Sequence, residues 1–330
     1  MKYLAVVFAT LVGATLSAQQ PAGITQGAAP TPSPQATVFR TGASLVALNV
    51  TVTDGKQFVA GLASDDFAVY EDGVRQEVRF FEATNVPLDL ILLIDTSSSM
   101  RDKMTIVQEA ARGFMKTLRP QDRGAVIEFN DTVTVGQALT SDRGAIEAAI
   151  NRSEARGGTA LNNALYIAIK QFGGVREDAE VRRQAIAVLS DGQDTTSLLS
   201  FDDVLGQARR SGVNIYTIAL KSSYQTSRPD GRQYFSESDY AMKELAKETG
   251  AQAFFPEKIV ELKNIYAAIA QELSSQYSIG YAPTNTRSDG RFRRIVVRIT
   301  SRPELKPRAR SGYQSGTSAT APSIDGGWPR

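Results

Sequence analysis

The sequence predicts an α/β fold, in which a doubly wound, mostly parallel sheet is inserted in or flanked by a small antiparallel β domain. The stretch at residues 88–94 is almost entirely aliphatic, which is typical of a strand covered on both faces. Strand-like and helical segments alternate from residue 87 to residue 274, as in parallel sheets with helices on both sides. Outside that range, apolar and polar residues alternate around Asp-Gly turns, which indicates antiparallel strands with one face in water.

The composition supports a globular core and excludes several kinds of site. The chain has 330 residues, of which 42% are hydrophobic, and it contains neither cysteine nor histidine. Disulfides, nucleophile pairs that need histidine, and the usual nitrogen and sulfur sites for zinc or copper are therefore excluded. The formal net charge of +2 lacks the strong excess of basic residues that is typical of proteins that bind nucleic acid or an anionic membrane. Only oxygen ligands remain for a metal ion.

Residues 1–18 are predicted to be a cleavable signal peptide. Lys2 supplies a positive charge, residues 4–12 form a short apolar run, and Ala18 ends the segment with a small residue. The run is too short to cross a bilayer, which takes ~20 apolar residues. We therefore expect no membrane span in the mature chain, and a secreted, periplasmic or cell-envelope location. The absence of disulfides suits a bacterial export route.

Two further terminal segments have compositions typical of disorder. Residues 19–37 are rich in proline, alanine, glycine, threonine and glutamine, and residues 314–330 are rich in serine, threonine, glycine and proline. Neither segment carries enough apolar surface to offset the entropy lost on ordering. They are predicted to be a disordered linker and a disordered tail.

The small β domain is predicted to form from residues 38–86 and 275–313. In the first segment, residues 45–52 alternate most plainly between apolar and polar side chains. In the second, strands are expected at residues 277–281, 291–300 and 306–313. A sheet of three or four strands needs a partner to be stable. We infer that the two ends of the chain meet in one domain, into which residues 87–274 are inserted.

Within residues 87–274, the predicted strands and helices alternate in a regular order. Strands are expected at residues 88–94, 124–129, 132–137, 185–189, 213–220 and 251–255. Helices are expected at residues 102–118, 142–151, 160–172, 201–211, 239–249 and 259–274. Ser141 is expected to cap the second helix, and Ser200 with Asp203 to form a capping box on the fourth. The arginine pairs at residues 182–183 and 293–294 are expected on exposed faces or sheet edges.

Three polar loops are expected at the carboxyl edge of this sheet, where ligands bind in doubly wound folds. The aliphatic strand runs into Asp95-Thr96-Ser97-Ser98-Ser99, in which alternate residues can point the same way. Arg156-Gly157-Gly158-Thr159 allows a close approach of backbone and brings a hydroxyl to a helix start. A second carboxylate, that of Asp191, follows another predicted buried strand in the sequence Leu189-Ser190-Asp191-Gly192.

The oxygen-bearing side chains of these loops suit a hard divalent cation. Mg²⁺ takes near-octahedral oxygen ligation and tends to keep waters. The candidate ligands are Asp95, Ser97, Ser99, Thr159 and Asp191. Because two carboxylates only balance the charge of the ion, it would remain electrophilic enough to take a further carboxylate from another molecule. We therefore expect Mg²⁺, or Mn²⁺ or Ca²⁺, and a protein partner that presents an acidic side chain.

The three loops resemble those of the metal-ion-dependent adhesion site in von Willebrand factor type A domains. The motifs that carry the resemblance are Asp-x-Ser-x-Ser, Gly-Gly-Thr and Ser-Asp-Gly, in that order along residues 88–274. The resemblance implies a Rossmann-like fold, and a binding or adhesion module that is not an enzyme. It makes Asp95 the anchoring carboxylate, Ser97 and Ser99 direct ligands, Thr159 a direct or water-mediated ligand, and Asp191 a carboxylate that acts through water.

The flanks of the central region are similar to those of a bacterial exported subgroup of this family. The similar segments are residues 65–73 and 308–313. Ser98 is a departure, because many relatives carry glycine there. The serine adds a side chain to the first loop but removes no ligand.

Two other functions remain open from the sequence. A phosphatase similar to the haloacid dehalogenases would use Asp95 as its nucleophile, but such enzymes place a carboxylate two residues later, where this chain has Ser97. They also need a lysine near the site, which the sequence does not assign. In the other alternative, the protein is a structural component of the cell envelope without a metal function.

Overall fold

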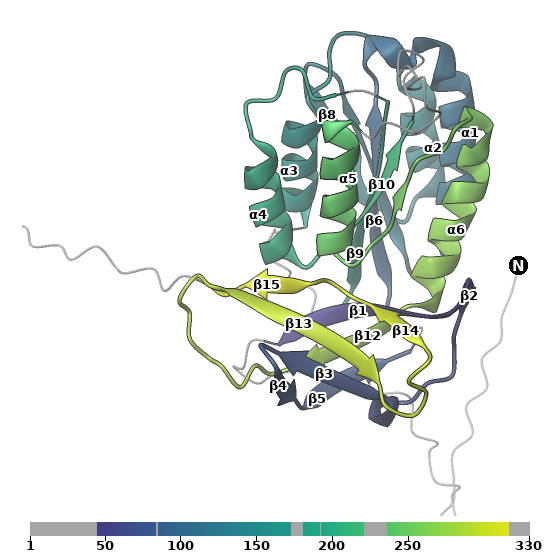
Figure 1. The fold of residues 1–330 in the computed structure, drawn as a ribbon. Coiled ribbons are helices and arrows are strands. Elements are labelled where there is room, and N and C mark those ends of the chain that lie inside the picture. The colour runs from purple at the N-terminus through teal and green to yellow at the C-terminus, as the bar shows by residue number, and fades with distance from the viewer. Residues whose placement is uncertain (1–44, 84, 173–180, 192, 221–235, 317–330) are drawn as a thin grey trace, which may run out of the picture. The chain divides into compact units, whose positions relative to one another are not determined.

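The computed structural model describes residues 45–83, 85–172, 181–191, 193–220 and 236–316, all of which belong to one compact unit (Figure 1). The predicted signal peptide and linker lie outside the described residues, as does most of the predicted tail. No helix within those described ranges is long and apolar enough to cross a bilayer.

A six-stranded sheet forms the centre of the α/β region, in the order β11-β10-β9-β6-β7-β8 (Figure 1). Neighbouring strands are parallel except for β7 and β8, which are antiparallel. This arrangement confirms the predicted fold class. The strands are β6 (Leu88–Asp95), β7 (Arg123–Phe129), β8 (Val133–Thr140), β9 (Arg183–Ser190), β10 (Asn214–Ala219) and β11 (Ala253–Phe254).

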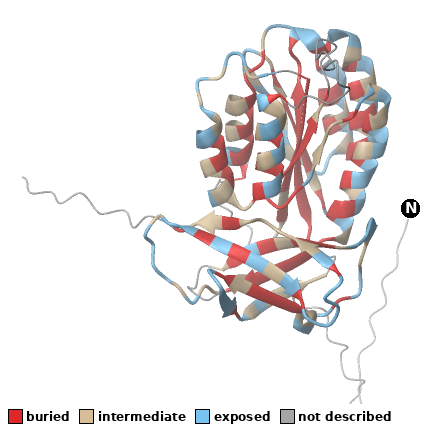
Figure 2. Ribbon diagram, viewed as in Figure 1, coloured by how far each residue is buried: buried red, intermediate tan, exposed pale blue. Residues whose placement is uncertain are grey.

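Helices cover both faces of this sheet, and β6 contributes to the core on each side. Leu90, Leu92 and Ile94 pack with α1, α2 and α6, whereas Ile91 and Leu93 pack with α3, α4 and α5. Figure 2 shows the resulting buried layer along the central strands. Burying one Leu or Ile side chain fully stabilises the folded state by roughly 1.5–3 kcal/mol. The helices are α1 (Met104–Met115), α2 (Arg143–Arg152), α3 (Leu161–Gln171), α4 (Phe201–Ser211), α5 (Glu237–Glu248) and α6 (Leu262–Ser275).

Two helix starts differ from the prediction, and one agrees with it. A 3₁₀ helix, Ser98–Lys103, precedes α1, so the α-helix itself begins later than residue 102. The N-cap of α2 is Asp142, whose carboxylate accepts from the Ala145 N–H at 3.1 Å; the prediction of Ser141 was wrong. Ser200 and Asp203 form the predicted capping box on α4. Asp142 stands three residues before that N–H, which is the spacing that a side-chain cap requires.

The β domain contains two antiparallel sheets built from both flanks of the central region. One sheet has the order β14-β1-β12-β5, and the other has the order β15-β13-β3-β4. β1 pairs with β12, and β3 pairs with β13, so early and late segments share both sheets. Their inner faces form one apolar core. The strands are β1 (Val46–Asp54), β2 (Gln57–Phe58), β3 (Phe67–Glu71), β4 (Val74–Gln76), β5 (Val78–Glu82), β12 (Tyr277–Tyr281), β13 (Phe292–Ile299), β14 (Lys306–Arg308) and β15 (Gly312–Gln314).

The single strand expected at residues 306–313 is in fact two strands, each in a different sheet. β14 pairs with β1, and β15 pairs with β13. Between them, Ser311 turns to α5, where its backbone N–H donates to the Glu248 carbonyl at 3.2 Å and its hydroxyl to the Glu248 carboxylate at 2.8 Å. Because the chain bonds to α5 at Ser311, it leaves its pairing with β1 there and continues into the sheet that contains β13.

Candidate metal centre

Backbone hydrogen bonds join the first two of the three predicted loops. The Ser98 N–H donates to the Gly157 carbonyl at 3.0 Å, and the Arg156 N–H donates to the Thr96 carbonyl at 2.7 Å. Gly157 has a φ of +71°, a left-handed conformation that favours glycine. The two loops therefore form one rigid edge beyond β6.

The third loop is bonded to both of the others. The N–H groups of Thr195 and Thr196 donate to the Thr159 carbonyl at 2.9 and 3.2 Å. The Ser190 hydroxyl donates to Asp95 Oδ2 at 2.6 Å, and the Ser99 hydroxyl donates to Asp191 Oδ1 at 2.7 Å. All five predicted ligands thus lie at the carboxyl edge of the sheet, four of them on these loops and Asp95 at the end of β6.

Asp95 is a fully buried carboxylate that is held by hydrogen bonds alone. Its exposed fraction is 0%. Oδ1 accepts from the Ser97 N–H at 2.8 Å, and Oδ2 accepts from Ser190. Burial raises the pKa of Asp95 and the negative charge of Asp191 adds to that rise, whereas the bonds from Ser190 and Ser97 oppose it. A cation at this carboxylate would supply the missing counter-charge.

The three predicted hydroxyl ligands differ in exposure and in their contacts. Ser97 is buried, and its Oγ lies 3.0 Å from Oγ of the exposed Ser99. Thr159 is 5% exposed, and its backbone N–H donates to the Thr195 hydroxyl at 3.1 Å. Within the described ranges, the Thr159 hydroxyl has no hydrogen-bond partner. It is therefore free to bind a ligand.

Lys103 is a member of this site that the sequence interpretation missed. Its Nζ forms an ion pair with Asp191 Oδ2, and the Asp191 side chain is only 1% exposed. Lys103 ends the 3₁₀ helix that starts at Ser98, so it lies between the first loop and α1, and its side chain reaches the third loop at Asp191. Its ammonium group at a buried carboxylate shows that this position attracts a positive charge.

The donor set fits a hard divalent cation with a hydroxyl-rich shell. In the described part of the chain, no three His, Cys, Asp or Glu side chains are grouped as in a conventional metal site. The three loops instead combine two carboxylates with hydroxyl oxygens, one of which is unpartnered. Mg²⁺, Mn²⁺ and Ca²⁺ accept such ligands, and they do not need nitrogen or sulfur.

Two further carboxylates hold the loops in place, and the sequence did not reveal their roles. Asp131 Oδ1 accepts from the Gly158 N–H at 2.6 Å, and a Cβ at Gly157 would lie 2.1 Å from Asp131 Oδ2. Asp194 accepts from the Asn162 N–H at 2.7 Å, so it caps α3, which has no side-chain cap of its own at Ala160. The sequences Asn130-Asp131 and Asp194-Thr195 are of a kind common in loops, so they do not by themselves predict these contacts.

Residues 89–268 match the family model of the von Willebrand factor type A domain. The chain belongs to this family. The von Willebrand factor type A domain therefore covers the central sheet, its helices and the three loops.

Curated relatives share the domain at low identity. A UPF0353 protein from Mycobacterium marinum is 29% identical over 201 residues, and a UPF0353 protein from Mycolicibacterium vanbaalenii is 27% identical over 204 residues. Each match covers 56% of this chain and 60% of the relative. The chain thus spans less than two thirds of the length of these relatives.

Solved structures of the same kind are also similar to this chain. One is described as von Willebrand factor type A from Catenulispora acidiphila, with a TM-score of 0.48, 16% identity, and coverage of 72% of this chain and 52% of that chain. Another is an aerotolerance-related membrane protein from Bacteroides fragilis, with a TM-score of 0.44, 19% identity, and coverage of 56% of this chain and 98% of that chain.

Proposed function

We propose that this protein is an exported, divalent-metal-dependent binding or adhesion module, in which an acidic side chain of a protein partner completes the shell of the metal. The observation that carries the proposal is the meeting of Asp95, Ser99 and Asp191 on hydrogen-bonded loops. Mg²⁺ is the proposed ion, with Mn²⁺ or Ca²⁺ as substitutes. When bound, the ion would supply a Lewis-acidic position for the partner's carboxylate.

The roles of the individual side chains follow from their environments. Asp95 is fixed from both oxygens by Ser97 and Ser190, so it would be the anchor of the site. Ser97 and Ser99 would offer hydroxyl oxygens next to it, and Thr159 a third from the second loop. Asp191, bonded to Ser99 and Lys103, would add the second negative charge.

One observation favours the phosphatase alternative, and two oppose it. Lys103 supplies a lysine near the site, as a phosphatase of the haloacid dehalogenase type requires. However, the lysine is paired with Asp191, and the candidate nucleophile Asp95 is fully buried with both oxygens hydrogen-bonded. Turnover of a generic phosphomonoester that is lost in Asp95→Asn would establish this alternative and overturn the binding role.

The proposal is tested by recovery of partners from an envelope extract with the mature chain as bait. We expect partners to be retained in millimolar Mg²⁺, to be released by EDTA, and to be absent with Asp95→Ala. The matched control is Asp102→Ala, which removes an exposed carboxylate from the 3₁₀ helix after the first loop. Retention that is unchanged in EDTA would rule out metal-dependent binding.

A melting-temperature measurement separates this proposal from a structural role without metal. A ligand that binds only the native state must stabilise that state. We therefore expect millimolar Mg²⁺ or Mn²⁺ to raise the melting temperature of the mature chain. The rise should be absent in Asp95→Ala and present in Asp102→Ala. If neither ion stabilises the wild-type chain, the site has no metal function.

A further inference from the structure

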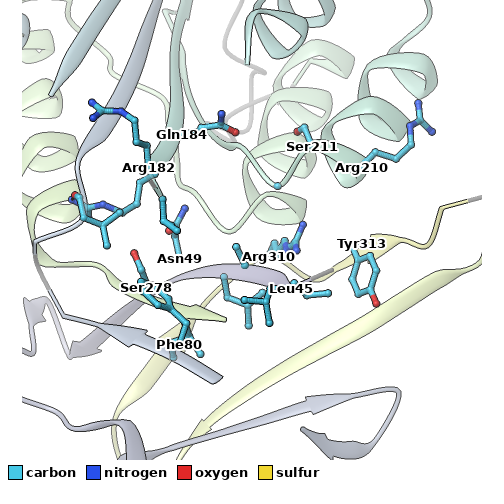
Figure 3. Close-up of a pocket in the computed structure, with 18 of the residues that line it drawn as sticks. Leu45, Asn49, Phe80, Arg182, Gln184, Arg210, Ser211, Ser278, Arg310 and Tyr313 are labelled. Carbon is cyan, nitrogen blue, oxygen red and sulfur yellow. The ribbon is translucent and has the colours of Figure 1, made fainter. Parts of the chain in front are cut away.

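A cavity of about 520 Å³ lies between the β domain and the α/β region (Figure 3). The β domain lines it with Leu45, with residues 46–49 of β1 and with Ser278 and Ile279 of β12. The α/β region lines it with residues 181–184 at the start of β9 and residues 210–212 at the end of α4. Its volume lies in the range of small-molecule sites, about 300–1,000 Å³. It is at the opposite edge of the sheet from the three loops.

The cavity is rich in arginine and poor in negative charge. Among its described lining residues there is no aspartate or glutamate, whereas four are arginines. Arg182 is balanced by an ion pair with Asp89 at 2.8 Å. Arg210 bonds to Gln207 at 3.2 Å, and in Figure 3 its side chain points away from Asn49 and Ser278. The other two arginines are Arg183 and Arg310.

Arg310 has no counter-charge within the part of the chain that the structure describes. Its side chain forms no ion pair or hydrogen bond there, and its polar contact is with the ring of Tyr313, 5.5 Å from the centroid. Its Nε is buried and unpartnered. Burial lowers the pKa of the Arg310 guanidinium, and the facing groups that oppose this shift are the hydroxyls of Tyr281 and Tyr313. The Glu71 carboxylate accepts from both tyrosines but forms no ion pair with Arg310.

A second unpartnered polar group lines the same cavity. Ser278 is 6% exposed, and its buried hydroxyl has no hydrogen-bond partner among the described residues. It stands opposite Asn49 in the β1–β12 ladder. The apolar side chains of Leu45 and Ile279 line the cavity beside them. The cavity therefore combines unsatisfied donors with an apolar wall.

We propose that this cavity binds a small molecule that carries an oxyanion, a carboxylate or a phosphate, on an apolar body. The Arg310 guanidinium pairs with the oxyanion and the Ser278 hydroxyl donates to it, while the apolar body packs against Leu45 and Ile279. Buried charges and polar groups are costly unless they are paired, and the guanidinium fork matches oxyanion geometry. The proposal is independent of the metal site.

The competing explanation is that the carboxyl end of α4 balances Arg310. Nη1 of Arg310 lies 3.1 Å from the position that a Cβ on Gly212 would occupy, next to the C-cap of that helix. A helix end carries a partial negative charge of roughly half a unit. This explanation predicts that Arg310 needs no ligand. The two explanations differ in whether added oxyanions stabilise the protein.

The experiment is thermal unfolding and calorimetric titration of the mature chain in EDTA, so that metal binding cannot contribute. The probes are inorganic phosphate, octanoate and benzoate, and sodium chloride at matched ionic strength is the reference. We expect at least one oxyanion to raise the melting temperature above the chloride reference. Stabilisation by phosphate alone would identify a phosphate ligand, and stabilisation by octanoate or benzoate a carboxylate with an apolar body.

Variants then assign the site. Arg310→Gln should weaken the bound probe about tenfold or more, as expected for loss of a charged hydrogen bond, and Ser278→Ala should weaken it less. The matched control is Arg302→Gln, which removes an exposed arginine of the β domain and should leave the affinity unchanged. The proposal fails if no probe stabilises the wild-type chain beyond chloride. It also fails if Arg310→Gln binds the probe as well as the wild type.

Discussion

The two ends of β6 each carry a buried aspartate, and the two aspartates have opposite surroundings. Asp89, near the start of the strand, is 2% exposed and accepts from Arg123 at 2.9 and 2.7 Å and from Arg182 at 2.8 Å. Asp95, at the end of the same strand, is 0% exposed and accepts from Ser97 and Ser190, which carry no charge. The two residues are thus of the same type and are exposed to a similar extent, but Asp89 has positively charged hydrogen-bond donors and Asp95 has neutral ones.

The pKa values of the two carboxyls follow this difference. Burial raises the pKa of Asp89, but the hydrogen bonds and charges of Arg123 and Arg182 outweigh it, so the pKa is lowered. Burial also raises the pKa of Asp95, and the bonds from Ser190 and Ser97 are too weak to reverse it. The chain supplies its own cations at the edge that meets the β domain. At the other edge Lys103 pairs with Asp191, but among the described residues no cation contacts Asp95.

The largest expected effect is at the structural end. Asp89→Asn should lower the free energy of unfolding by about 3–5 kcal/mol, because it removes the buried carboxylate that forms ion pairs with Arg123 and with Arg182, whose side chain is 8% exposed. Urea unfolding monitored by circular dichroism measures this. Asp102→Asn removes an exposed carboxylate and should change stability by about 0.5 kcal/mol at most. Equal effects of the two variants would mean that the Asp89 network contributes nothing.

The same substitution at the other end should have a different result. Asp95→Asn, measured in EDTA, should change the free energy of unfolding by about 1 kcal/mol at most, because no ionic partner is lost and the amide can still bond to Ser97 and Ser190. In Mg²⁺, however, the variant should lack the rise in melting temperature that we expect for the wild type. If Asp95→Asn destabilised the metal-free chain as strongly as Asp89→Asn, the two ends would be equivalent and the comparison would be wrong.

Sequence reasoning succeeded where a residue type decides the structure locally. The aliphatic run at residues 90–94 is typical of a strand covered on both faces, and the capping box at Ser200 is set by spacing within one turn. The alternation of strands with helices was enough to predict the fold class. The loops that carry Asp95 and Asp191 could be placed at one sheet edge because the parallel strands β6 and β9 end there together, whereas Thr159 lies between α2 and α3 and its place was indicated only by the Gly-Gly-Thr motif.

The failures involve partners that are distant in sequence. Arg182-Arg183 was expected to be exposed, but Arg182 pairs with Asp89, and the buried Arg183 donates to carbonyls of Leu273 and Val86. Arg293 is likewise buried, at 5% exposed, although Arg294 is exposed as expected. An arginine pattern on a strand gives no sign of a carboxylate about ninety residues away. Lys103 was missed for the same reason, because its partner Asp191 lies 88 residues away in the sequence.

A pH series tests the Asp89 end without changing the fold at neutral pH. Because the pKa of Asp89 is lower in the folded than in the unfolded chain, its pairing stabilises the protein fully above the ordinary aspartate pKa of about 3.9. That stabilisation is lost as the pH falls through the lowered pKa. The wild type should therefore lose stability on acidification more steeply than Asp89→Asn. Melting temperatures of both chains between about pH 2 and pH 6 measure this, and parallel curves would contradict it.

The smallest expected effect comes from removing the lysine that pairs with Asp191 near the carboxyl end of β6. Lys103 is the one partly internal cation described at that end, with a side chain 23% exposed, and it contacts Asp191. A partly exposed ion pair contributes up to about 1 kcal/mol, so Lys103→Met should strengthen Mg²⁺ binding by about two- to fivefold, because the ion no longer competes with the ammonium group for Asp191. Titration of the melting temperature with Mg²⁺ measures this change in affinity.

The matched control is Lys116→Met, which removes a lysine 66% exposed beside Glu147 and should leave the titration unchanged. Weaker Mg²⁺ binding in Lys103→Met would show instead that the lysine supports the loops, and that the chain does supply a cation at both ends of β6.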